Sequence, residues 1–110
     1  MAGVVHLPFY ATGFRGDDIE AALVQLAPIS LRYGAKRYEV FRSRDDRYKF
    51  LLSIDFENKG DWDAFWFGEE FTEWRAACTS WYTVPLLYVW HDRVAHGGLR
   101  EPVAADALEE

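Results

Sequence analysis

The sequence contains a single cysteine, Cys78, so no disulfide can form within the chain. The thiol falls on the apolar stripe of a predicted helix, which favours a buried side chain over a nucleophile or a redox sensor. A chain without disulfides suits a reducing compartment, and we predict a cytoplasmic location.

Long apolar runs and an excess of basic residues are also missing. No uninterrupted apolar span approaches about 20 residues, and no basic stretch near the N-terminus precedes an apolar run, so neither membrane insertion nor export is indicated. The 12 Lys and Arg residues are outnumbered by 18 Asp and Glu residues, which gives a formal net charge of -6. Because this charge repels phosphate backbones and anionic lipids, we expect no nucleic acid and no membrane as partner.

The motifs of several common chemistries do not occur. There is no glycine-rich phosphate loop, no nucleophile elbow and no motif of paired catalytic carboxylates. The histidines, His6, His91 and His96, have no spacing typical of a metal site, so we predict no metal and no cofactor.

Aromatic residues are plentiful, at 17% of a chain that is half hydrophobic. A single domain of this length has a limited interior, so we expect apolar surface to be buried in a homodimer or higher homo-oligomer. The stretch 60–81 carries four of the five tryptophans. One continuous helix would leave Trp62 and Trp66 on its outer face. We predict that Gly68 breaks the stretch into two helices that turn both rings inward; the alternative is a partner that covers that face.

Hydrophobic periodicity predicts the remaining elements. Strands are expected at 4–10, 36–41, 48–57 and 82–91, with a helix that starts at Asp17 or Asp18, is kinked or ended by Pro28, and stops at Gly34. Pro8 and Pro85 cannot donate to a ladder, which indicates irregular pairing or an edge position.

The order of these elements predicts the fold class. It is α+β, a ferredoxin-like βαββαβ arrangement with a four-stranded antiparallel sheet and its helices on one face. Residues 1–93 are predicted to form the single domain and residues 94–110 a C-terminal tail. The bare face of the sheet, which carries Pro8 and Leu51, needs a cover, and a second copy of the same sheet is the simplest one.

One face of the first strand presents candidate catalytic residues. His6 and Tyr10 share it, and the neighbouring third strand brings Ser53 and Asp55 alongside. A histidine oriented by a carboxylate can remove a proton from a phenolic or enolic substrate, and the resulting carbanion reacts with dioxygen without a metal. We therefore take His6, Tyr10 and Asp55 as candidate catalytic residues; the alternative is a satisfied polar contact within a dimer interface.

A pocket for a small aromatic ligand is expected between the sheet and the helices. Its predicted lining residues are Tyr33, Tyr38, Ser53, Trp66, Trp81 and Trp90. Aromatic residues at such periodic positions are also typical of core packing, and this alternative stays open.

Two runs resemble a known family: LAPISLRYGAKRYEVFRSRDD (26–46) and YKFLLSIDFENKGDWDAFWFGEEFTEWR (48–75). They are similar to the dimeric α+β barrel superfamily, in particular its antibiotic-biosynthesis-monooxygenase-like branch, and the resemblance extends over residues 4–90. It is a pattern of apolar spacing with few chemical groups, and it implies the fold more directly than an activity.

The resemblance implies several activities, because the superfamily includes cofactor-independent oxygenases of aromatic polyketides, haem-degrading monooxygenases and small proteins with no established reaction. Trp66 lies near the haem-ruffling tryptophan of the haem-degrading type. The iron-ligating histidine of that type is missing, with Trp74, Arg75 and Ala76 in its place, so we do not expect haem degradation. Two hypotheses remain. One is a cofactor-independent monooxygenase acting on an aromatic or polyketide-like molecule. The other is a non-catalytic homodimer that binds a ligand or assembles through Trp62, Phe65 and Trp66.

Overall fold

The computed structural model describes residues 2–99, and four strands of this part of the chain form one antiparallel sheet in the order β2-β3-β1-β4. The strands are β1 (Gly3–Tyr10), β2 (Ala35–Arg42), β3 (Lys49–Phe56) and β4 (Val89–His91). The first and third strands are therefore central, with the second and fourth at the edges. This order is the ferredoxin-like one, so the predicted fold class is confirmed.

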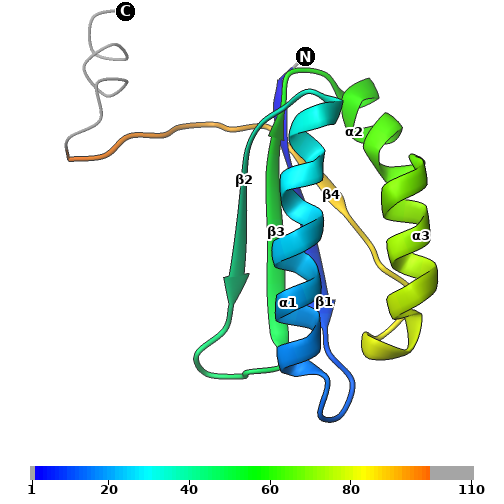
Figure 1. The fold of residues 1–110 in the computed structure, drawn as a ribbon. Coiled ribbons are helices and arrows are strands. Elements are labelled where there is room, and N and C mark those ends of the chain that lie inside the picture. The colour runs from blue at the N-terminus through cyan, green and yellow to red at the C-terminus, as the bar shows by residue number, and fades with distance from the viewer. Residues whose placement is uncertain (1, 100–110) are drawn as a thin grey trace, which may run out of the picture.

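The helices cover one face of the sheet (Figure 1). They are α1 (Gly16–Leu26), α2 (Lys59–Trp66) and α3 (Glu69–Cys78), with 3₁₀ segments at Ala27–Tyr33 and Thr79–Trp81. The α-helical geometry of α1 gives way at Pro28, which stands in the first turn of the 3₁₀ segment. Gly34 ends that segment with φ at 100°, the left-handed conformation that glycine tolerates best.

Alternation along the central strands builds the core. Val5, Leu7 and Phe9 of β1 face the helices, as do the four residues of β3 at positions 50, 52, 54 and 56. The opposite residues of both strands lie on the face that no helix covers, here called the open face. The alternation of side chains along the strands therefore decides which face of the sheet is buried against the helices.

Gly68 divides the aromatic stretch as predicted. It lies between α2 and α3, and its extended backbone (φ -70°, ψ 163°) changes the chain direction there. Trp62 is consequently fully buried, and its ring packs edge-on against Phe56 and Phe71. Trp66 is partly buried beside it. The predicted alternative of assembly through Trp62, Phe65 and Trp66 is therefore wrong for Trp62 and Phe65, because both are fully buried within the chain.

The predicted strand at 82–91 is wrong in its first half, because only Val89–His91 pairs as a strand with β1. The Thr83 N–H donates to the Tyr10 carbonyl at 2.8 Å, and the chain then leaves β1 until the ladder resumes between His6 and Val89. The backbone N–H and C=O groups of the even-numbered residues of β1 point toward this edge, as those of Tyr10 do. At position 8 the ladder would need an N–H donor, and proline has none. We call residues 82–88 the β4 approach.

Beyond β4, residues 92–95 line a hollow together with open-face residues of β1, β2 and β3, and the chain then runs away from the sheet (Figure 1). Arg93 pairs with Asp55 of β3 at 2.9 Å as it leaves. Of the predicted C-terminal tail, residues 100–110 lie outside the described residues. Within residues 2–99, no helix has both the length and the apolar character needed to cross a membrane.

Candidate functional site

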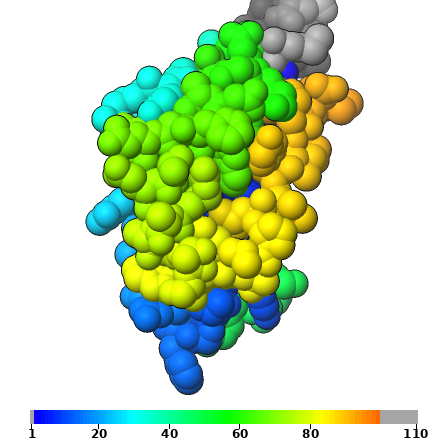
Figure 2. Space-filling view, turned by 90° about the vertical axis from the view of Figure 1, so that its right-hand side faces the viewer, coloured from blue at the N-terminus to red at the C-terminus, as the bar shows by residue number. Residues whose placement is uncertain are grey.

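A cleft separates α3 from the β4 approach. Its volume is about 470 Å³, within the range of small-molecule sites. The space-filling view shows the surface hollowed between the yellow-green atoms of α3 and the golden atoms of the β4 approach (Figure 2). The lining residues are Trp66, Arg75, Ala76, Thr79, Tyr82, Val84, Pro85 and Leu86. We call this hollow the α3 cleft.

Aromatic rings form one wall of the α3 cleft. Trp66, the last residue of α2, is placed there by the turn at Gly68. Its ring lies 5.1 Å from Phe71 and 5.4 Å from Tyr88, both edge-on. These contacts hold the indole in place at the cleft, and the Arg75 guanidinium covers one face of its ring.

Arg75 is the charged residue of the cleft. Its guanidinium carbon lies 3.9 Å above the centre of the Trp66 ring and 4.7 Å above that of Phe71. The Nη1 atom is buried and has no hydrogen-bond partner within residues 2–99. Burial lowers the pKa of the Arg75 guanidinium, and the nearby Tyr82 hydroxyl opposes this only in part.

Tyr82 adds a hydroxyl to the cleft. It is almost fully buried, and its ring stacks on Trp74 at 5.9 Å with an angle of 10°. The hydroxyl donates to the Arg75 carbonyl at 3.4 Å, which is a long hydrogen bond. Burial raises the pKa of Tyr82, so the phenol stays protonated.

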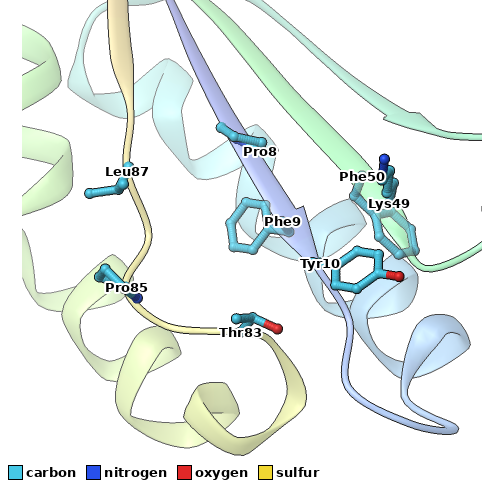
Figure 3. A pocket seen from close by; sticks show the side chains of 8 residues that line it. All are labelled: Pro8, Phe9, Tyr10, Lys49, Phe50, Thr83, Pro85 and Leu87. Atoms are coloured by element: carbon cyan, nitrogen blue, oxygen red, sulfur yellow. The ribbon is translucent and has the colours of Figure 1, made fainter.

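A second hollow of about 470 Å³ opens on the other side of the β4 approach, where that segment leaves β1 (Figure 3). It is lined by Pro8, Phe9, Tyr10, Lys49, Phe50, Thr83, Pro85 and Leu87. Figure 3 shows the Phe9 ring turned into the gap between β1 and the β4 approach. Pro85 lines both hollows, so the β4 approach is their common wall.

The predicted catalytic histidine lies on the open face, away from the α3 cleft. His6 is opposite Ser53 in the sheet, as expected, but its Nδ1 atom meets Nδ1 of His91 at 2.7 Å. Burial, followed by the His91 ring, lowers the pKa of His6, while Asp55 acts in the opposite direction. The two Nδ1 atoms therefore form one hydrogen bond, in which one imidazole donates and the other accepts.

The other two candidate catalytic residues have partners of their own. The Asp55 carboxylate pairs with Arg93, and the Tyr10 hydroxyl donates to Asp46 at 3.2 Å. The structure thus brings Asp55 and Tyr10 onto the same face as His6, but each is engaged elsewhere.

The predicted pocket residues are dispersed. Trp66 lines the α3 cleft, and Ser53 is buried on the open face next to His6. Tyr33 donates to Glu70 at the start of α3, and this hydrogen bond lowers the pKa of the Glu70 carboxyl.

The remaining predicted pocket residues lie apart from the cleft. Tyr38 is on the edge strand β2, and the Trp81 ring lies under the Arg15 guanidinium, 5.2 Å away. Trp90 packs so closely on Gly3 that a Cβ there would lie 2.6 Å from its ring.

Sequence reasoning did not select Arg75 and Tyr82. A signal for Arg75 exists in the sequence, since no acidic residue lies three or four positions away on either side: these are Phe71, Thr72, Cys78 and Thr79. Tyr82 carries no comparable signal. As for metals, residues 2–99 contain no group of three or more potential ligand side chains.

Comparisons with known proteins agree on the fold. Neither a protein-family model nor a curated protein sequence matches the chain. Solved structures do match. The "putative antibiotic biosynthesis monooxygenase" of Nitrosomonas europaea aligns over 88% of this chain and 94% of its own, with a TM-score of 0.77 and 19% identity.

Two further structures carry the same name. The protein from Bordetella bronchiseptica aligns over 86% of this chain and 98% of its own (TM-score 0.75, 21% identity). The one from Deinococcus radiodurans aligns over 92% and 100% (TM-score 0.76, 16% identity). At these identities the likeness establishes the fold, and it agrees with the resemblance found in the sequence.

Proposed function

We propose that the protein is a homodimeric, cofactor-independent monooxygenase that binds a small aromatic or polyketide-like molecule in the α3 cleft. The observation that carries the proposal is the cleft itself: a cavity of about 470 Å³ with a fixed indole wall and few polar groups. Such a lining is typical of sites for flat apolar ligands. The name borne by the structural neighbours points to the same reaction class.

The reaction needs no group beyond substrate and dioxygen. A methylene between two aromatic rings that conjugate it with a carbonyl, as in anthrone, loses a proton to water and becomes a carbanion, which transfers electrons to O₂; the released proton is recovered in the H₂O that forms. The carbon then becomes a carbonyl: CH₂ + O₂ gives C=O + H₂O, with one oxygen atom in each product. The protein's part is to position the substrate and favour its anion.

Oxygen uptake with anthrone as substrate tests this reaction, in buffer with a metal chelator. We expect one O₂ consumed per anthraquinone formed, above the rate without protein. Trp66→Leu should lower the protein-dependent rate because the cleft loses its indole wall. Trp81→Leu is the matched control, since Trp81 lies outside the cleft. No protein-dependent uptake with any anthrone concentration would count against the enzyme.

The dimer part of the proposal rests on the open face. Tyr10, Phe41 and Val89 project from it and are 47%, 48% and 49% exposed. Phe41 is opposite Leu51, which is opposite Pro8, so apolar residues follow one another across three strands. A face of this kind is typically buried against a second subunit.

Sedimentation equilibrium distinguishes the dimer from a protomer of 12.8 kDa. We expect about twice that mass at micromolar concentration, and a shift toward the protomer in Phe41→Asp. Leu31→Asp is the control, because Leu31 is 49% exposed on the helical side. A protomer mass for the unchanged protein would refute the dimer.

The non-catalytic alternative keeps one favourable observation: His6, Tyr10 and Asp55 all have partners within the chain. Under that hypothesis aromatic ligands bind and the dimer forms, but oxygen uptake equals the rate without protein. The anthrone assay therefore decides between the two.

A further inference from the structure

Arg75 differs from the other buried or paired arginines of residues 2–99. Five arginines form ion pairs with carboxylates: Arg15, Arg32, Arg37, Arg42 and Arg93. The Arg75 guanidinium has no ion pair and no hydrogen bond in this part of the chain, although it lies within the cleft wall. Its charge is therefore partly removed from water without a counter-charge.

Packing alone does not account for this arrangement. The faces of Trp66 and Phe71 stabilise a cation, which explains why the guanidinium lies over them. A ring face, however, supplies no acceptor in the plane of the guanidinium, where the buried Nη1 atom has no hydrogen-bond partner within residues 2–99. Buried donors without acceptors destabilise a fold, so a residue of this kind at a cavity indicates a ligand that supplies the acceptor.

The missing acceptor has a defined chemistry. A guanidinium presents parallel N–H groups that match two oxygens of a carboxylate or one phenolate or enolate oxygen. Apart from the hydroxyls of Thr79 and Tyr82, the rest of the cleft is apolar and aromatic, which suits a conjugated ring system beside that oxygen. The net charge of -6 opposes anions at long range, so recognition has to come from this local, desolvated cation.

We propose that the α3 cleft selects an aromatic oxyanion, bound through its oxygen to Arg75 and with its ring against the apolar side chains of Val84, Pro85 and Leu86. The inference rests on the proposed function and names its substrate class. Arg75 then has a role in the chemistry too, because a cation beside the oxygen stabilises the enolate or phenolate form, in which the α carbon of the enolate, or the ortho and para carbons of the phenolate, are electron-rich.

Isothermal titration with two matched ligands tests the selectivity. 2-Naphthoate carries the anion, and 2-naphthalenemethanol is its neutral counterpart. We expect the unchanged protein to bind naphthoate roughly 10- to 100-fold more tightly, the factor expected for a hydrogen bond to a charged group. Arg75→Gln should remove this preference. Arg44→Gln, in the exposed hairpin turn, is the control and should keep it.

A second titration separates a carboxylate substituent from the oxygen of the reacting ring. 2-Naphthol is neutral at pH 7, and its phenolate has its own absorbance. If Arg75 stabilises a ring oxyanion, the pKa of bound naphthol falls by about one to two units, and Arg75→Gln abolishes the fall. A lowered pKa of bound naphthol would show that Arg75 binds an oxygen of the ring itself. A preference for naphthoate without this lowered pKa would show that Arg75 binds a carboxylate substituent.

The outcomes keep this inference separate from the proposed function. Equal affinity for naphthoate and naphthalenemethanol, with no shift for naphthol, overturns the oxyanion but leaves an aromatic-binding cleft. Retention of the preference in Arg75→Gln overturns the assignment to Arg75. If none of the three ligands binds, the α3 cleft is not a site for aromatic ligands, and the proposed function is refuted as well. The ligand comparison on the unchanged protein needs no variant, and Arg75→Lys, which keeps the cation, tests the site if the glutamine variant does not fold.

Discussion

The corner at Gly68 sets the direction of α3, and replacing this glycine by alanine tests how tightly the corner is packed. An added Cβ would lie 2.6 Å from the Tyr33 hydroxyl and 2.8 Å from the Ala64 carbonyl oxygen. The backbone angles of Gly68 are open to any residue, so the cost is steric and not conformational. The Tyr33 hydroxyl can swing away, but the Ala64 oxygen belongs to the helix backbone and has to move with α2.

The expected cost follows from overpacking. Forcing an extra carbon into a well-packed site destabilises a protein by about 1–3 kcal/mol. For a domain of this size each kcal/mol lowers the melting temperature by roughly 4 °C, so Gly68→Ala should lose about 4–12 °C. Gly60→Ala is the matched control. Gly60 lies within α2 and has nothing within 4 Å of an added Cβ, so alanine there should add roughly 0.5–1 kcal/mol through helix propensity.

Urea denaturation of the two variants and the unchanged protein, at one protein concentration, measures both changes. A fixed concentration is needed because dimerisation would couple stability to mass action. The opposite signs of the two shifts are the decisive result. If both alanine variants shifted the urea midpoint in the same direction by the same amount, a Cβ at position 68 would fit without strain. Tight packing at Gly68 would then not explain why the Trp62 side chain points into the core.

Two further predictions follow from titratable groups. Since burial and the neighbouring His91 lower the pKa of His6, the unfolded chain binds that proton more readily than the folded one. Stability should therefore fall as the pH drops below the ordinary histidine value of about 6.5, and the fall should be smaller in His6→Gln than in His96→Gln, as urea midpoints between pH 7.5 and 5 would show. The Cys78 thiol is 5% exposed and burial raises its pKa, so a thiol reagent such as DTNB should modify the folded protein far more slowly than the urea-unfolded chain.

Local pattern was sufficient for much of the fold. The alternation of Val5, Leu7 and Phe9 and of the matching residues in β3 identified the dry face, because a strand offers only two sides. Gly34 and Gly68 were identified as breaks because glycine ends helical segments for reasons that act within a few residues. With the strand order limited by right-handed crossovers, these elements lead to the ferredoxin-like sheet.

The fourth strand and the site depend on contacts that local pattern does not contain. Residues 82–88 have strand-forming side chains, but their partner strand offers Pro8 where a donor is required, and the ladder fails at that point. The cleft arises from this failure, since a paired strand would have closed the gap beside α3. The sequence shows that Arg75 has no acidic residue three or four positions away on its own helix. Only the fold shows that no other element within residues 2–99 places a carboxylate beside it.

The shared wall of the two hollows predicts that the proposed dimer and the proposed ligand site are coupled. The β4 approach is hydrogen-bonded to β1 at Thr83, and the strand that follows it pairs with β1 from Val89. Between these two points it separates the α3 cleft from the second hollow, which is lined by Pro8 and Tyr10 of β1. A second subunit packed on the open face would press on Leu87 and Pro85 and hold the cleft wall in place. Phe41→Asp should therefore weaken 2-naphthoate binding at the concentration where it dissociates the dimer, although Phe41 lies outside the cleft. Leu31→Asp should not. If a monomeric Phe41→Asp protein bound naphthoate as tightly as the unchanged dimer, the β4 approach would be rigid on its own, and the site would be complete in a single protomer.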